Sequence, residues 1–278
     1  SEGRGRRGFF HTEHHSRKGL SVMEHVSSTT LYDRGGHKFL FLGWEEQEEE
    51  TAVQTNQYVI TSGDEVMLLD PGGAHVFPRV LANVAEIVDL RKIRHIFYSH
   101  QDPDVSSGIT LWLSMAERAT VHISGLWVRF LPHFGIYDTK RIAAIPDHGE
   151  TLTFGNGATV KLIPSHFLHS TGCFSLFDPL SRVLFSGDIG AAIFPKGGRY
   201  PEAGSFESHI RLMEGFHRRY MASNAACRKW VSLVRALDPA VIAPQHGAVM
   251  AGENVGKFLD WFERLQCGTD VLGDIYGK

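Results

Sequence analysis

Residues 93–105 read IRHIFYSHQDPDV, and this stretch predicts a buried strand that ends at a site. Its first seven residues are rich in β-branched and aromatic side chains, which is typical of a strand. The ligand types His100, Asp102 and Asp104 follow, and alternate residues of an extended segment would point the same way. Pro103 stiffens the run and favours extended geometry at Asp102. Strand ends are where α/β folds place their sites, so we expect one here.

Ligand types also follow three other expected strands. They are His169, Asp188 and His246, after the expected strands 159–163, 182–186 and 240–243. Any one of them alone would be interpreted as a polar loop residue. The full set has three imidazoles and three carboxylates, which is more than one four-coordinate zinc ion needs. The sequence therefore predicts a site for two metal ions.

The expected elements follow one plan in each half of the chain, strands first and helices after. We expect strands at 38–43, 57–61, 65–70, 93–99, 120–124, 151–154, 159–163, 173–177, 182–186 and 240–243. We expect helices at 78–88, 106–117, 126–134, 209–221, 225–237 and 254–265. No linker separates the halves, so the economical α/β fold is an αββα four-layer sandwich, with both sheets between helices.

Composition limits the class of protein. The 278 residues carry a net charge of −3, which gives no bulk argument for binding nucleic acid. Three cysteines without a CxxC motif exclude a Cys-rich metal site and favour a reducing cytoplasm. No apolar run reaches the roughly 18 residues of a membrane span, and the basic, polar residues 1–19 are not expected to be a signal peptide. Residues 1–19 are basic and predict a disordered arm before a single domain over 20–278, and the acidic run 45–50 predicts a solvated loop.

Five other residues need an interpretation, and three of them have two. Tyr58 is expected in the core, with a hydroxyl near the site as the alternative. His166 either lies on the surface or lines a pocket. His209 and His217 lie on an expected helix and are expected to face solvent. Cys173 is expected to be a small buried hydrophobe, and a reactive thiol is the alternative.

From about residue 22 to residue 265, the chain resembles the metallo-β-lactamase superfamily. The usual hydrolase motif there is His-x-His-x-Asp-His, whereas residues 100–105 read His-Gln-Asp-Pro-Asp-Val. A carboxylate in the second slot is similar to the His-x-Glu-x-Asp motif of the flavodiiron proteins. Four more segments resemble that branch: TNQYVI at 55–60, LHS at 168–170, LFSGD at 184–188 and IAPQHG at 242–247.

The resemblance implies a role for each candidate ligand. His100, Asp102 and His169 would bind one metal, Asp104 and His246 would bind the other, and Asp188 would bridge the two.

Two departures from the family pattern affect this assignment. Asp102 stands where the relatives usually have Glu, and its shorter arm would shift or loosen the first metal. Val105 replaces a histidine that often completes the second metal's shell. That leaves an open position for a diatomic ligand, a substrate or water.

The ligand types favour iron, with manganese or zinc as alternatives. The resemblance then implies a non-haem di-iron protein that binds O2 or NO. It would act as an oxygen sensor with a signalling partner, or as a reductase with electrons from a separate donor. We expect no flavodoxin-like FMN domain like that of the relatives after His246, because too few residues follow it, and homodimers are common in that family. A two-metal hydrolase such as a phosphodiesterase is the alternative, with Asp104 or Asp188 as catalytic groups. A binding module with a structural metal is a third class.

Overall fold

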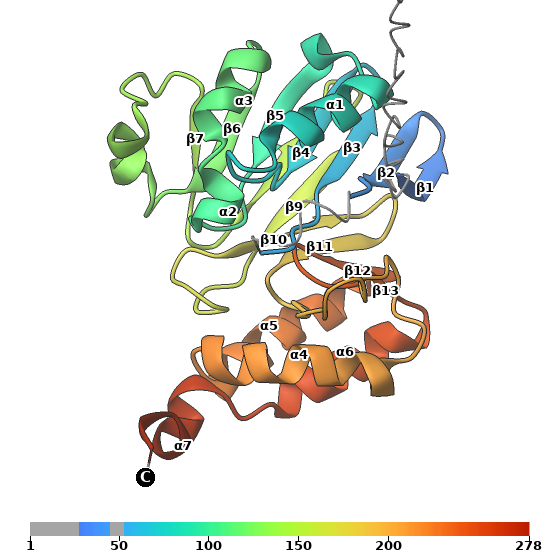
Figure 1. The fold of residues 1–278 in the computed structure, drawn as a ribbon. Coiled ribbons are helices and arrows are strands. Elements are labelled where there is room, and N and C mark those ends of the chain that lie inside the picture. Colours follow the sequence, from blue (N-terminus) through green and yellow to red (C-terminus); the bar gives the residue numbers. More distant parts are fainter. Residues whose placement is uncertain (1–27, 45–52, 278) are drawn as a thin grey trace, which may run out of the picture.

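A computed structural model describes residues 28–44 and 53–277. The expected arm 1–19, the expected start of order near Leu20 and the expected loop 45–50 lie outside the described residues. Two β-sheets pack face to face, and helices cover the outer face of each sheet (Figure 1). The αββα four-layer sandwich expected from the sequence is therefore confirmed.

The first sheet has seven strands in chain order. They are β1 (Thr29–Arg34), β2 (His37–Phe41), β3 (Tyr58–Ser62), β4 (Glu65–Leu69), β5 (Ile93–Phe97), β6 (Thr120–Ser124) and β7 (Ile142–Ile145). The strands β1 to β4 pair antiparallel, and β4 to β7 pair parallel. The helical segments of this half are α1 (Phe77–Ile87), η2 (Leu90–Lys92), α2 (Pro103–Ser106), α3 (Ile109–Met115) and η3 (Val128–Phe134).

The second sheet has six strands, in the order β13-β12-β11-β10-β9-β8. Their bounds are β8 (Glu150–Thr153), β9 (Thr159–Pro164), β10 (Phe174–Asp178), β11 (Val183–Gly187), β12 (Val241–Pro244) and β13 (Met250–Ala251). Only β11 and β12 pair parallel among the described strands of this sheet. The helical segments are α4 (Phe206–Tyr220), α5 (Asn224–Leu237), α6 (Glu253–Arg264), η4 (Gly268–Val271) and α7 (Leu272–Tyr276).

Three apolar cores hold the four layers together. Between the sheets, Phe39, Phe97 and Phe185 are fully buried. A second core lies between the first sheet and its helices around Trp112, and a third lies between the second sheet and α4 to α6 around Trp230. Alternate residues of each strand face opposite sides, so strands buried on both faces supply two cores at once.

The segment after β5 is extended at Asp102 as expected, with φ −59° and ψ 147°, but it differs from the expected extended form from Pro103 onward. Pro103 begins α2, three residues before the expected helix at 106–117, because proline fits the first helical turn. Asp102 is therefore the N-cap residue of α2, and Asp104 lies in the first turn of that helix. The two carboxylates are presented by a helix start and not by alternation along a strand.

Two expectations about histidines were wrong. His209 and His217 are fully buried, although we expected both to face solvent. Both lie on the side of α4 that packs over the second sheet, four residues to either side of the buried Met213.

The expected helix at 126–134 is the 3-10 segment η3. No helix among residues 28–44 and 53–277 has the length and apolar character to cross a membrane.

Candidate metal centre

The structure brings the six candidate ligands to one place, at the ends of strands from both sheets. They are His100 after β5, Asp102 and Asp104 at the start of α2, His169 between β9 and β10, Asp188 after β11 and His246 after β12. The three imidazoles and Asp188 are largely buried, while Asp102 and Asp104 are partly exposed. Rigid strands thus deliver polar groups to the rim where the two halves of the chain meet.

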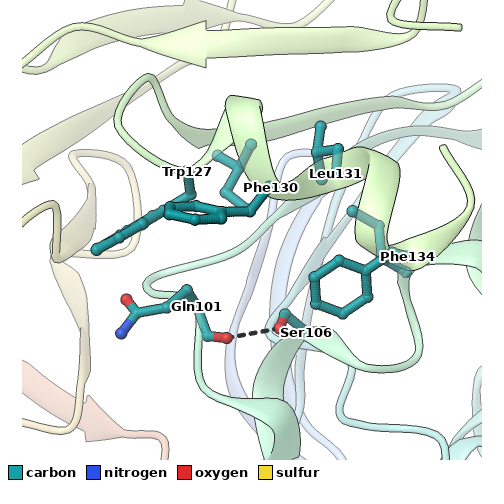
Figure 2. A pocket seen from close by; sticks show the side chains of 8 residues that line it. Gln101, Ser106, Trp127, Phe130, Leu131 and Phe134 are labelled. Atoms are coloured by element: carbon teal, nitrogen blue, oxygen red, sulfur yellow. Dashed lines mark hydrogen bonds between the residues drawn. The ribbon is translucent and has the colours of Figure 1, made fainter. Parts of the chain in front are cut away.

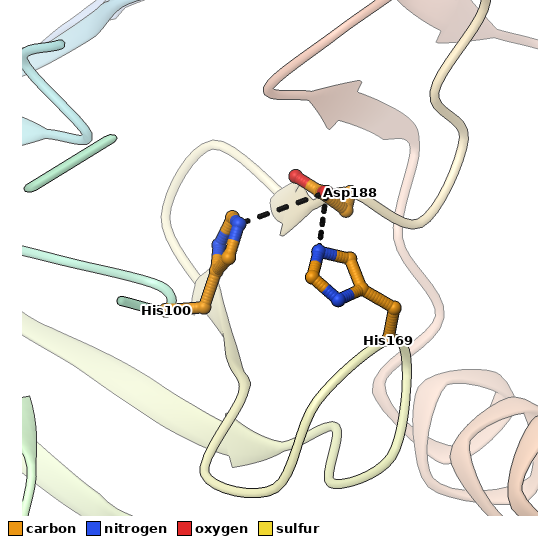
Figure 3. A group of neighbouring side chains, drawn as sticks. All are labelled: His100, His169 and Asp188. Atoms are coloured by element: carbon orange, nitrogen blue, oxygen red, sulfur yellow. Dashed lines mark ion pairs between the residues drawn. The ribbon is translucent and has the colours of Figure 1, made fainter. Parts of the chain in front are cut away.

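The first set of contacts surrounds one oxygen of Asp188. His169 Nε2 lies 3.1 Å from Asp188 Oδ2 and 3.3 Å from Asp102 Oδ2. His100 Nε2 lies 3.6 Å and 3.8 Å from the same two oxygens. Figure 3 shows the two imidazoles facing the Asp188 carboxylate from different loops. Ligand atoms of His100, His169 and Asp188 all lie within 4.8 Å of one another, close enough to share one ion.

The second set of contacts uses the other oxygen of Asp188. His246 Nε2 lies 3.6 Å from Asp188 Oδ1 and 3.3 Å from Asp104 Oδ2. The two oxygens of one buried carboxylate therefore face two different groups of side chains.

Two buried atoms in the centre have no hydrogen-bond partner among the described residues. They are His100 Nε2 and Asp188 Oδ1. Leaving such atoms unpaired in a protein interior costs about 1–3 kcal/mol each, so each of them is expected to contact a further ligand. Imidazole and carboxylate donors without a thiolate suit iron or manganese, and the residues present fit a pair of such ions.

The carboxylates and imidazoles of the centre shift one another's pKa values. Burial opposes protonation of His169, but Asp102 and Asp188 outweigh it and raise its pKa to about 10. Burial likewise opposes protonation of His246, but Asp188 and Asp104 raise its pKa to about 9. Burial works against ionisation of Asp188, yet the surrounding imidazoles hold the pKa of that carboxyl well below its usual range. Metal ions would displace these protons, because only neutral imidazole coordinates.

A buried hydrogen-bond chain orients His100. Its Nδ1 lies 2.8 Å from Ser99 Oγ, which donates to Asp70 Oδ2 at 2.5 Å, while the Ser99 amide donates to Asp70 Oδ1 at 2.7 Å. Burial raises the pKa of Asp70 to about 7 against the opposing effects of His100 and Ser99. Sequence reasoning placed Asp70 only at the end of a strand and missed this role. The sequence signal that could have indicated it is a carboxylate directly after the apolar run 66–69.

The loop that carries His246 is held from the first half of the chain. His246 Nδ1 lies 2.6 Å from the Gln54 carbonyl oxygen. Asn56 donates to the carbonyl oxygens of Pro244 and Gly247 at 2.9 and 2.8 Å. Tyr58 is buried in the core as expected, and its hydroxyl also donates to the Pro244 carbonyl at 2.9 Å.

Histidines that are not candidate ligands support the ligand loops. His217 Nε2 accepts from the Gly190 amide at 2.9 Å and its Nδ1 donates to the Met213 carbonyl at 2.8 Å, which fixes a neutral ring beside the turn after Asp188. His166, partly buried, accepts from the Gly172 amide at 3.2 Å in the loop of His169.

A family model described as "ODP family beta lactamase" matches residues 53–247, which span every candidate ligand. The chain belongs to this ODP family. It is similar to a solved structure described as the peroxy diiron species of the chemotaxis sensor ODP. That match has 47% identity and a TM-score of 0.81, covering 90% of this chain and 100% of the other. The apo state of the chemotaxis sensor ODP from T. denticola matches with 46% identity and a TM-score of 0.79, over 89% and 98% of the two chains.

This ODP-family chain is also similar to the flavo-diiron protein FprA2 of Clostridium acetobutylicum. The two are 23% identical over 241 residues, which is 82% of this chain. The chain spans 58% of the length of that relative. The resemblance to flavodiiron proteins is thereby confirmed.

Two apolar cavities adjoin the centre of this ODP-family chain. One, of about 320 Å³, reaches His246 between Phe194, Phe216 and Tyr220. The rings of Phe216 and Tyr220 also stand edge-on to His169, at 6.4 and 5.9 Å between centroids. The other cavity, of about 270 Å³, lies beside Gln101 and is drawn in Figure 2. Apolar walls of this kind suit a small uncharged ligand better than a highly charged one.

Proposed function

We propose that this chain is a non-haem di-iron protein that binds O2 and acts as an oxygen sensor. Six side chains would be the iron ligands: His100, Asp102 and His169 for one iron, Asp104 and His246 for the other, and Asp188 for both. The observation that carries this proposal is the division of the Asp188 oxygens between two groups of contacts.

Iron is favoured over manganese and zinc for two reasons. The donors are imidazole and carboxylate without thiolate. The similar structure at 47% identity is described as a diiron species. When bound, a ferrous pair would supply the electrons and the open position at which O2 or NO binds. Val105 is fully buried where hydrolases of the superfamily have a histidine, so it gives the second metal no ligand.

Sensing is favoured over reduction because the similar structures at 46–47% identity are described as chemotaxis sensors. A sensor needs a signalling partner. A reductase would need electrons from a donor outside the described unit, and Asp104 and Asp188 would then be the groups in contact with the reacting ligand. A homodimer, a cytoplasmic location and the lack of a nucleic-acid partner remain predictions.

The two-metal hydrolase is not favoured. Hydrolases of the superfamily have a second histidine where this chain has Asp102, and the relatives reported above are di-iron and flavo-diiron proteins. The cavity at His246 is also lined mainly by apolar side chains, which would bind a phosphodiester poorly.

The test is an oxygen titration of the iron-loaded protein. We would purify the protein anaerobically, measure its metal content, load Fe(II), and record the visible spectrum as O2 is admitted. We expect two irons per chain and a new charge-transfer band in the near-ultraviolet or visible range. Two tightly bound zinc ions, no response to O2 and rapid cleavage of a phosphodiester would contradict the proposal.

A further inference from the structure

Asp102 is the candidate ligand that the fold constrains least. It occupies the N-cap position of α2, where an aspartate usually accepts a hydrogen bond from the helix start, yet its side chain makes no such bond. Its carboxylate turns toward His169 and His100, and 36% of the side chain is exposed. A short, partly solvated carboxylate needs another contact to keep one oxygen aimed at a metal.

The amide of Gln101 supplies that contact. Gln101 Nε2 donates to Asp102 Oδ1 at 3.2 Å, and Gln101 Oε1 accepts from Ser170 Oγ at 3.0 Å. A carboxylate can only accept, so the amide nitrogen must face Asp102 and the amide oxygen must face Ser170. The oxygen that Gln101 holds is Oδ1, which leaves Oδ2 as the atom that faces the two histidines.

We propose that Gln101 is a positioning residue for the first metal, because its amide clamps Asp102 to the loop that carries His169. The inference rests on the proposed di-iron function and deepens it. Ser170 directly follows His169 in the chain, so one side chain links the two loops that supply three of the first metal's ligands. This clamp compensates for the short arm of Asp102.

The surroundings of Gln101 allow its amide to be removed without disturbing the fold. Its backbone is held separately, because Ser106 Oγ donates to the Gln101 carbonyl at 2.8 Å (Figure 2). Its side chain borders the 270 Å³ cavity, which Trp127 and Phe134 help to line. An apolar side chain of the same length would find apolar neighbours there, so Gln101→Met removes the clamp with little loss of packing.

The experiment is an anaerobic Fe(II) titration of the wild type and of Gln101→Met. Removing an outer-shell partner of a metal ligand typically lowers metal affinity by roughly 10–100-fold. We therefore expect a loss of that size at one of the two irons, with the other unchanged. The Mössbauer spectrum of the loaded variant should change for one iron. Ser170→Ala should give a smaller loss at the same iron, and the double variant should lose less than the sum of both.

Leu131→Met is the matched control. Leu131 lines the same 270 Å³ cavity as Gln101, so this variant places a methionine there and leaves the Gln101 amide in place. It should keep wild-type affinity for the first iron.

Each outcome decides between the two claims. Two irons in the wild type with equal affinity in Gln101→Met would overturn the clamp and leave the di-iron function standing. Equal losses at both irons, or a lower melting temperature of the metal-free variant, would show a general structural role and also overturn it. Failure of the wild type to bind two irons would overturn the proposed function itself.

Discussion

Asp188 is the residue on which both groups of contacts depend. It directly follows the buried strand β11, and its side chain is 5% exposed. Its Oδ2 faces His169 and His100, and its Oδ1 faces His246. A carboxylate in this position both neutralises charge and fixes the separation of two ions.

Replacing this carboxylate should therefore empty both metal positions. We expect Asp188→Ala, loaded with Fe(II) and then desalted, to retain neither ion. Asp102→Ala should lose only the first ion, because its contacts are confined to the group around Asp188 Oδ2. Elemental analysis per chain measures this. A full pair retained by Asp188→Ala would show that the bridge is assigned wrongly.

At the scale of residues, sequence reasoning found most of the candidates that follow an expected strand. It passed over Asp70, although this carboxylate ends the expected strand 65–70, and it did not find His217. Asp70 accepts from the Ser99 amide, and His217 accepts from the Gly190 amide. Both residues act on segments that are distant in sequence, so the partner of each could not be predicted. Their roles appear only once the chain is folded.

The helix α4 shows how an element was misinterpreted. His209, Met213 and His217 recur every four residues and form its buried stripe. Counting histidine as polar hid this spacing. The strand β1 was missed for a related reason, because its residues are exposed or only partly buried and carry no apolar alternation. Strands that are buried on both faces, such as β10 and β11, were correctly expected.

Burial of His217 in α4 predicts a specific acid sensitivity. Burial lowers its pKa to about 4, from an ordinary value of 6.5. In the unfolded chain His217 therefore binds a proton below about pH 6.5, whereas in the folded chain it binds one only below about pH 4. As the pH is lowered from 6.5 to about 4, this group should therefore lower the free energy of unfolding by on the order of 3 kcal/mol.

Urea unfolding of the wild type and His217→Phe at several pH values measures this effect. At pH 7 the variant should be less stable by about 1–3 kcal/mol, because the Gly190 amide loses its acceptor. The difference should shrink or reverse toward pH 4, because phenylalanine cannot take up a proton. Curves that stay parallel from pH 7 to pH 4 would contradict the prediction.

For the whole molecule, the main feature is that the centre joins the two halves of the sandwich. Three candidate ligands follow β5 in the first half, and the other three come from the second half. The four-layer architecture itself could be predicted from the sequence, because the strand–helix plan occurs twice. The pairing of ligands across the halves came only from the family resemblance, because the residues alone do not show how the sheets face each other.

A metal pair at this junction should stabilise the whole fold. Each ion present at 100 times its dissociation constant adds about 2.7 kcal/mol. For a chain of this size we expect the melting temperature to rise by roughly 5–10 °C per ion under anaerobic conditions. Calorimetry with Fe(II) and with a chelator would measure it. If both samples melted at one temperature, the ions would not bridge the halves.

The spacing of the ligands along the chain also has a kinetic consequence. His100 and His246 lie more than half the chain length apart, so bringing the ligands together in an unfolded chain costs loop-closure entropy. The complete ligand set forms when both sheets have docked, and we expect the ions to bind late in folding. Bound metal should then act as a brake on unfolding and leave the folding rate unchanged. A loaded molecule would be long-lived, and it would acquire its metal as a finished protein and not as a growing chain.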